Sequence, residues 1–122
     1  MKKDGKVAQH AMKPFGQIRI VLVTCANRKQ ARAIAQSVVK KRFAACVNIL
    51  SAPVESIYRW KGKVESANEV LLLIKTTSKR LLDLEREVKR LHSYETPEFV
   101  VIPLVAGSRE YLQWINDSVR PV

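Results

Sequence analysis

The stretch EVLLLIKT at residues 69–76 does most to decide how this chain folds. Its apolar residues run without a break from Val70 to Ile74, which predicts a strand that is covered on both of its faces. Before it, Val54–Trp60 alternates in character, and the KGK sequence at 61–63 supplies a hairpin turn between the two segments. A second strand of the buried kind is predicted at Ile18–Cys25. The centre of the protein is therefore expected to be a β-sheet.

Two helices are predicted around these strands. The first spans residues 28–42, with Asn27 as its N-cap and Gln30 as the capping-box partner. The second follows Ser78, a candidate N-cap, and covers residues 81–91. Its surface carries acidic and basic side chains spaced to pair at i+3 or i+4, namely Asp83, Glu85, Glu87, Arg86, Lys89 and Arg90.

Two more strands complete the pattern, at Ala44–Leu50 and Phe99–Val105, and GS at 107–108 opens a short C-terminal helix. This order predicts an α+β fold, a ferredoxin-like βαββαβ sandwich. Its four-stranded antiparallel sheet carries two helices on one face, plus the short C-terminal helix. The opposite face of the sheet would be bare. Because two of the strands are apolar on both faces, we expect other copies of the chain to cover it.

Length and composition limit the class of protein. The 122 residues suffice for one domain, and 47% apolar with 27% charged residues is a globular balance. We expect residues 1–16 to be a flexible basic arm and residues 17–122 to be a single domain. Two cysteines, Cys25 and Cys46, are too few for a disulfide-stapled secreted domain, and no run approaches the roughly 18 apolar residues of a membrane helix. A cytoplasmic protein is expected.

The net charge of +11 is carried by residues 1–61, whereas residues 62–122 hold equal numbers of acidic and basic side chains. Such asymmetry can indicate a nucleic-acid or membrane-surface partner. Here the basic residues fall in the arm and on the exposed face of the first helix. We interpret them as a solvated surface, so neither nucleic acid nor a membrane is expected as a partner.

The sequence contains no recognisable catalytic constellation. There is no Gly-x-Ser-x-Gly turn and no glycine-rich phosphate loop, so we predict that the protein is not an enzyme. The two histidines are His10, in the arm, and His92, at the end of the second helix. Cys25, at the end of the first strand, and His92 are the candidate metal ligands, with Glu98 as a further carboxylate. A thiolate and an imidazole together suit copper.

A group of aromatic and charged residues is the second candidate site. Tyr58 and Trp60 lie two residues apart on one strand and therefore face the same side, as a ligand wall or as interface packing. Glu69 and Lys75 share one face of the next strand. A lysine that bounds an apolar strand either extends its amine to water or pairs with an anion.

The sequence closely resembles the CutA family of divalent-cation tolerance proteins over residues 18–117. The resemblance rests on blocks in a fixed order: VTCAN at 23–27, KRFAACVN at 41–48, SIYRWKGK at 56–63, EVLLLIKT at 69–76, HSYETPE at 92–98 and YLQWI at 111–115. It implies a cytoplasmic, very stable homotrimer of ferredoxin-like subunits, similar in architecture to the PII signalling proteins. It also implies a role in tolerance of copper and other divalent metals, with no established enzymatic activity.

The resemblance further implies two sets of site residues. Family members with proposed copper ligands have a cysteine at the end of the first strand and two adjacent histidines after the second helix. In this chain Thr24 stands at that cysteine position, Leu91 replaces the first histidine, and Ser93 replaces a proline after His92. Weak copper binding through Cys25 and His92 is expected. The ligand pocket of the family is matched by Tyr58, Trp60, Glu69, Lys75, Tyr94 and Glu98.

Two functions remain open. One is weak binding of copper or another divalent cation by a homotrimer that needs no obligatory cofactor. The other is a PII-like sensor that binds a small anionic ligand between subunits, with Lys75, Trp60 and Tyr94 lining the site. An RNA-recognition motif shares this strand order but stacks bases on aromatic residues of its third strand, and residues 69–76 contain none. An acylphosphatase-like enzyme would need a glycine-rich loop where ANRK stands at 26–29.

Overall fold

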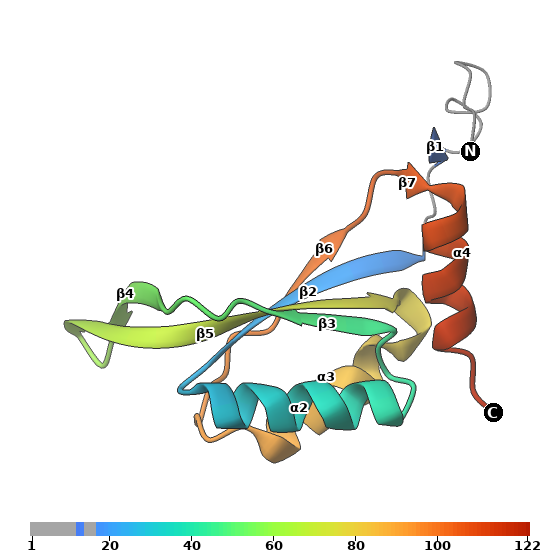
Figure 1. The fold of residues 1–122 in the computed structure, drawn as a ribbon. Helices are drawn as coiled ribbons and strands as arrows, with labels where there is room; N and C mark the ends of the chain where they lie inside the picture. Colours follow the sequence, from blue (N-terminus) through green and yellow to red (C-terminus); the bar gives the residue numbers. More distant parts are fainter. Residues whose placement is uncertain (1–11, 14–16) are drawn as a thin grey trace.

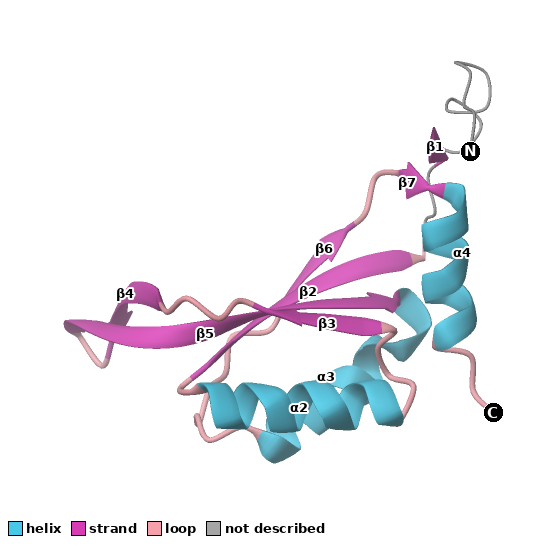
Figure 2. Ribbon diagram, in the orientation of Figure 1, coloured by secondary structure: helices cyan, strands magenta, loops and turns pink. Residues whose placement is uncertain are grey.

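The computed structural model describes residues 12–13 and 17–122, and an antiparallel sheet forms its centre. Four strands lie side by side in the order β3-β5-β2-β6, and their bounds are β2 Ile18–Cys25, β3 Cys46–Ile49, β5 Lys63–Thr77 and β6 Val100–Pro103. Helices α2 (Arg28–Lys40) and α3 (Leu81–Leu91) both lie beneath the sheet in Figures 1 and 2. This is the ferredoxin-like arrangement that the sequence predicts.

The hairpin differs from its prediction in the length of its second strand. β5 begins at Lys63 rather than Glu69, and its first part pairs with β4 (Val54–Trp60) while its second part pairs with β2 and β3. The polar residues before Glu69 hide the strand from a hydrophobicity pattern, but the backbone ladder with β4 continues through them. The result is a two-stranded ribbon that projects beyond the rest of the sheet (Figure 1).

Several predicted ends are also corrected. α2 stops at Lys40 instead of residue 42, because Arg42 adopts a left-handed backbone conformation with φ of 63°. β3 and β6 are shorter at both ends than the predicted Ala44–Leu50 and Phe99–Val105. Ser78 does not cap α3; it begins a short 3-10 helix, η1 (Ser78–Arg80), which leads into it. The predicted N-cap of α2 is confirmed, since the Asn27 side chain accepts from the Gln30 backbone N–H at 2.9 Å.

The main core lies between the sheet and the two helices. Val21, Val23 and Cys25 of β2 point to this side, as do Leu72 and Ile74 of β5, and they pack against the buried stripe of α2 and α3. Because side chains alternate along a strand, the residues between them face the open side. The half-buried ones there include Ile20, Leu22, Leu71 and Leu73. This explains why both strands are apolar on two faces.

A smaller core lies at the N-terminal end of β2. Helix α4 (Arg109–Ser118) covers Ile18 with Leu112 and Ile115. Next to it, β1 (Met12–Lys13) pairs with β7 (Gly107–Ser108), so a small part of the predicted arm makes backbone contacts with the domain. The rest of that segment, His10 included, lies outside the described residues. No helix among residues 12–13 and 17–122 is long and apolar enough to cross a membrane.

A buried carboxylate joins the two helices beneath the sheet. Glu87 of α3 accepts hydrogen bonds from Ser37 of α2 and from Arg90, and it pairs with Lys41 at 3.0 Å. The hydrogen bonds from Arg90 and Ser37 hold the pKa of Glu87 well below its usual range. The predicted pairs on α3 are all confirmed, including Lys89 with Glu85 at 3.3 Å.

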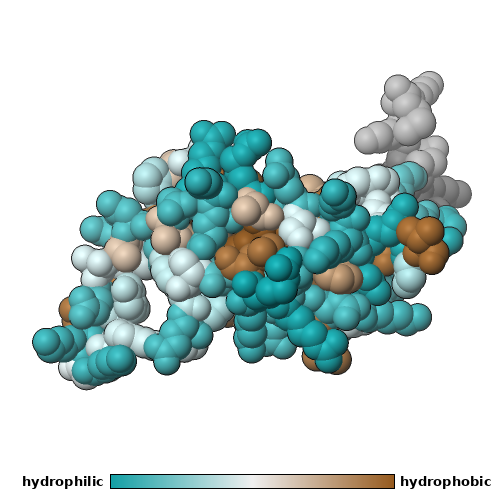
Figure 3. Space-filling model, turned by 90° about the horizontal axis from the view of Figure 1, so that it is seen from below, coloured by the Kyte–Doolittle hydropathy of each residue, from teal (hydrophilic) through white to brown (hydrophobic). Residues whose placement is uncertain are grey.

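The two sides of the molecule differ in character. Figure 3 views the side that carries α2 and α3, where the surface is hydrophilic around a small apolar patch. Exposed apolar residues are numerous elsewhere: Ile57, Tyr58, Trp60 and Val64 on the ribbon, Val100 and Ile102 on β6, and Tyr111 and Trp114 on α4. On the helix side, Leu82 of α3 and Val39 of α2 are exposed apolar residues, at 67% and 40%.

Candidate functional site

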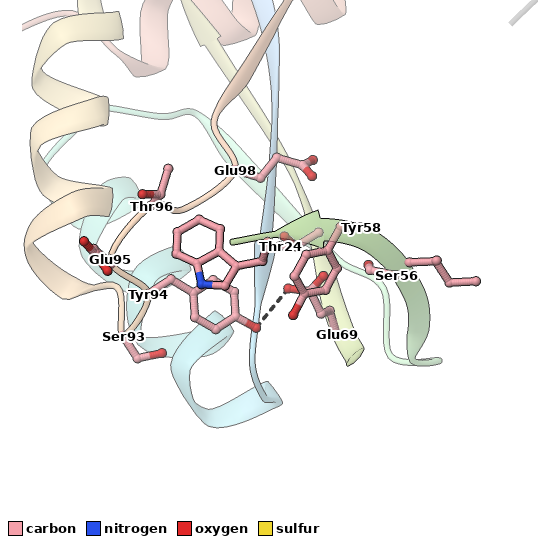
Figure 4. A pocket seen from close by; sticks show the side chains of 11 residues that line it. Thr24, Ser56, Tyr58, Glu69, Ser93, Tyr94, Glu95, Thr96 and Glu98 are labelled. Carbon is pink, nitrogen blue, oxygen red and sulfur yellow. Dashed lines mark hydrogen bonds between the residues drawn. The ribbon is translucent and has the colours of Figure 1, made fainter. Parts of the chain in front are cut away.

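A hollow with a volume of about 670 Å³ lies where the ribbon leaves the sheet. β4 and β5 form one wall, and the loop that follows α3 forms the opposite wall, with the end of β2 between them (Figure 4). The described residues that line it are Thr24, Ser56, Ile57, Tyr58, Trp60, Glu69, Ser93, Tyr94, Glu95, Thr96 and Glu98.

Glu69 and Tyr94 join the two walls. The Tyr94 hydroxyl donates a hydrogen bond of 2.9 Å to Oε2 of Glu69, drawn as the dashed line in Figure 4. Burial raises the pKa of Tyr94 to about 12, and the hydrogen bond and negative charge of Glu69 add to the effect. Glu69 is itself only 7% exposed, and it has no ion-pair partner among the residues that the structure describes.

His92 orders the loop instead of pointing a free nitrogen into the pocket. Its Nε2 lies 2.7 Å from the carbonyl oxygen of Thr24, and because a carbonyl can only accept, Nε2 must carry the proton. Its Nδ1 accepts the backbone N–H of Tyr94 at 3.1 Å. Both ring nitrogens are therefore in use, and ligation of a metal by His92 would require one of these bonds to break.

Cys25 and Thr24 lie on opposite faces of β2. Cys25 is buried in the core beneath the sheet, whereas Thr24 lines the pocket. Burial, with the charge of Glu69 as a second cause, raises the pKa of Cys25 to about 11, so the thiol stays protonated at neutral pH. Within the described part of the chain, no three His, Cys, Asp or Glu side chains are grouped as metal ligands.

Most of the predicted pocket residues come together. Tyr58, Trp60, Glu69, Tyr94 and Glu98 all line the hollow. Lys75 does not. It lies six residues from Glu69 along β5, and its ammonium group sits 5.5 Å from the centre of the Tyr111 ring on α4. Among the residues that the structure describes, no lysine or arginine lines the pocket to pair with an anionic ligand.

Sequence reasoning missed several residues of the lining. Ser56 shares a strand face with Tyr58, so the alternation that selected Tyr58 could have selected it as well. Ser93, Glu95 and Thr96 flank Tyr94 in the loop, where no periodic pattern exists. Ile57 belongs to the lining although it alternates with Ser56 and Tyr58. No pattern in the sequence indicates this.

Comparison with known proteins agrees with the fold. The family model described as CutA1 divalent ion tolerance protein matches residues 19–118. This chain belongs to that family. The divalent-cation tolerance protein CutA of Thermus thermophilus is 46% identical over 99 residues, which are 81% of this chain and 95% of that protein. Human protein CutA is 43% identical over 107 residues, which are 88% of this chain but 59% of the human one.

Solved structures of relatives superimpose well. The Thermus thermophilus divalent cation tolerance protein gives a TM-score of 0.82 at 44% identity, covering 84% of this chain and 99% of that one. CutA from Synechococcus elongatus, in complex with a Bis-Tris molecule, gives 0.80 at 31% identity, covering 88% of this chain and 98% of that one. The chain is thus similar to divalent-cation tolerance proteins over nearly its whole described length.

Proposed function

We propose that this protein serves divalent-cation tolerance as a non-enzymatic homotrimer that binds a divalent cation weakly at the pocket. Glu69 is the observation that carries the proposal. It is a nearly buried carboxylate that accepts a hydrogen bond from the Tyr94 hydroxyl and has no ion-pair partner among the described residues. A buried charge without a counter-charge is costly, and a bound cation would remove that cost.

The donor set points to weak binding. Glu69, Glu95 and Glu98 supply carboxylate oxygens along the pocket, but they are not grouped closely enough to form a preformed metal cage. Divalent ions bind a given donor set in a regular order, with Cu²⁺ the tightest of the first-row series. Both copper and manganese should therefore bind weakly, and copper should have the higher affinity of the two. A small anion is less well suited, because the lining is acidic and Lys75 lies elsewhere.

Calorimetric titration of the metal-free protein with Cu²⁺, Zn²⁺ and Mn²⁺ tests this function. We expect saturable copper binding that weakens in Glu98→Gln, which removes a pocket carboxylate. Cys25→Ala should bind as the parent does, because the thiol is buried on the other face of the sheet. Glu110→Gln, in the first turn of α4, is the matched carboxylate control. If Cys25→Ala lost copper binding and Glu98→Gln kept it, the metal would be bound at the thiol instead.

Separate observations support the proposed trimer and the proposed cytoplasmic location. β2 and β5 carry apolar side chains on the side of the sheet that α2 and α3 leave uncovered, and burying such a surface is the usual driving force for assembly. Both cysteines are unpaired, which agrees with the reducing environment of the cytoplasm.

A further inference from the structure

The side of the molecule that carries α2 and α3 has a strong excess of positive charge. Residues 28–42 contain six basic and no acidic side chains, and residues 78–91 contain five basic and three acidic ones. The two helices are neighbours, since Glu87 of α3 accepts a hydrogen bond from Ser37 of α2 and pairs with Lys41 at 3.0 Å. Both charged segments therefore share one side of the protein, which is the mostly hydrophilic surface of Figure 3.

Five exposed basic residues on this side point away from the core at helical spacing. On α2, Lys29, Arg32 and Lys40 lie away from the buried stripe of the helix. On α3, Arg86 and Lys89 lie three residues apart on the side opposite its buried residues. We call these five residues the basic face.

The acidic side chains near the basic face do little to neutralise it. α2 has none, and Glu87 is buried. Asp83 and Glu85 are half-buried, and each already pairs with a basic neighbour on its own helix or just before it. The three members of the basic face on α2 make no ion pair with any residue that the structure describes. Their positive charge is therefore available to a polyanion.

The side chains around these charges favour a phosphate backbone over an acidic protein or a membrane. Protein interfaces and membrane-surface helices depend on aromatic or large apolar anchors among their charges. The exposed large apolar residues of α2 and α3 are only Val39 and Leu82, and the exposed aromatic residues of the described chain lie on β4 and α4. A nucleic acid needs only spaced cations, because a duplex carries one negative charge per about 1.7 Å of its axis.

The shape of this side favours contact with the backbone and not with the bases. The 13 residues of α2 span about 20 Å at 1.5 Å per residue, which is long enough to meet several phosphates. The two helices form one layer beneath the sheet, so neither projects alone as a helix that could enter a groove (Figures 1 and 2). Bases are read in the grooves or stacked on aromatic rings, and α2 and α3 expose no aromatic ring.

We propose that the basic face binds the phosphate backbone of a nucleic acid without selecting its sequence. The sequence pattern alone indicated a solvated surface. The structure adds that these residues gather on one side and that the acidic groups there are buried or paired. The basic face lies across the sheet from the side proposed for assembly and contains no residue of the pocket, so this inference goes beyond the proposed function and does not depend on it.

Fluorescence anisotropy with a labelled DNA duplex of about 20 base pairs tests the proposal, with the full-length, metal-free protein titrated in at about 50 to 200 mM salt. We expect saturable binding, and log K should fall linearly with log salt with a slope of about −3 to −5, at about 0.9 per phosphate contact. A second duplex with the same bases in shuffled order should bind within about threefold. No binding at the lowest salt, or a larger preference for one duplex, would overturn the proposal.

A double variant then locates the binding. Arg32→Gln with Arg86→Gln removes two charges of the basic face and keeps a good helix former at both exposed positions. The salt slope should become shallower by about 2, and both duplexes should be weakened alike. Arg59→Gln with Arg109→Gln is the matched control, because it removes the same charge from exposed positions on β4 and α4. Equal losses in the two double variants would overturn the assignment to the basic face.

Sedimentation with phosphatidylserine–phosphatidylcholine vesicles at the same salt separates a membrane from a nucleic acid. Because the face holds few apolar anchors, we expect the vesicles to retain less protein than the duplex binds under equal conditions. Binding to the vesicles without binding to the duplex would overturn the proposal in favour of a membrane surface.

Discussion

The two halves of β5 belong to one strand but lie in different surroundings. Its second half lies between β2 and β3 above the helices, where Leu72 and Ile74 are inaccessible to solvent. Its first half pairs with β4 in the projecting ribbon, where Val64 is 67% exposed. Glu69 lies where the halves meet. The core half therefore fixes the position of a carboxylate that the ribbon half and the loop enclose.

This comparison explains why a pocket forms at this place. Glu69 pairs with Val54 of β4, and Thr24 pairs with Leu71 of β5, so the backbone ladders of the sheet position both residues. The ribbon and the loop after α3 bring the aromatic side chains to them. Sites that rest on a packed sheet keep their geometry better than sites built on loops alone.

The largest expected effect comes from a change in the core half. Leu72→Ala removes a side chain that is inaccessible to solvent in the main core. It should lower the free energy of unfolding by about 2–5 kcal/mol, as other large-to-small core substitutions do. Leu82→Ala on α3, where the side chain is 67% exposed, should change it by no more than about 0.5 kcal/mol. Denaturation at one fixed protein concentration measures both, and similar losses would contradict the assignment of the core.

The ribbon half should affect assembly more than folding. Val64 on the ribbon and Leu82 on the helix side are both 67% exposed in a single chain, so they form a matched pair. If the ribbon contacts other copies, Val64→Asp should lower the mass measured by light scattering towards the 13.9 kDa of one chain. Leu82→Asp should leave the mass unchanged. Equal masses for the two variants would remove Val64 from the interface.

Much of this division could be predicted from the sequence, because the core half of β5 has a strong signal. The unbroken apolar run from Val70 to Ile74 and the helical periodicities predict the sheet, the helices and their order. The hydrophobic pattern does not predict the full length of the ribbon, because most residues just after Lys63 are polar and pair through their backbone. Element ends such as Arg42 depend on a local backbone conformation that no hydrophobic pattern records.

The site was predictable where it lies on strands and less so where it lies on the loop. Alternation placed Tyr58 and Trp60 on one wall, and the family blocks supplied Tyr94 and Glu98. Lys75 shares a strand face with Glu69, but a shared face says nothing about distance along the strand. The role of His92 depends on two hydrogen bonds to backbone groups, and one of these, to Thr24, comes from a segment far away in the sequence.

The smallest effect is expected at the helices that cover the core half. Glu87→Gln keeps the shape of the side chain but weakens the hydrogen bonds and ion pairs with Ser37, Lys41 and Arg90. We expect a loss of about 1–2 kcal/mol in the free energy of unfolding at neutral pH, because these bonds involve a charged acceptor. Thermal melts of the parent and the variant across a pH series measure it.

The pH series also tests whether the charge of Glu87 causes the loss of stability in Glu87→Gln. The folded protein holds the pKa of Glu87 below its usual range, so the unfolded chain takes up a proton first as the pH falls. The advantage of the parent over Glu87→Gln should therefore be complete above the ordinary glutamate pKa of about 4.3 and should shrink steadily below it. Glu85→Gln, whose partner Lys89 is exposed, should show little difference at any pH. A loss in Glu87→Gln that stayed constant down to strong acid would mean that the side chain stabilises the helix pair by its packing and not by its charge.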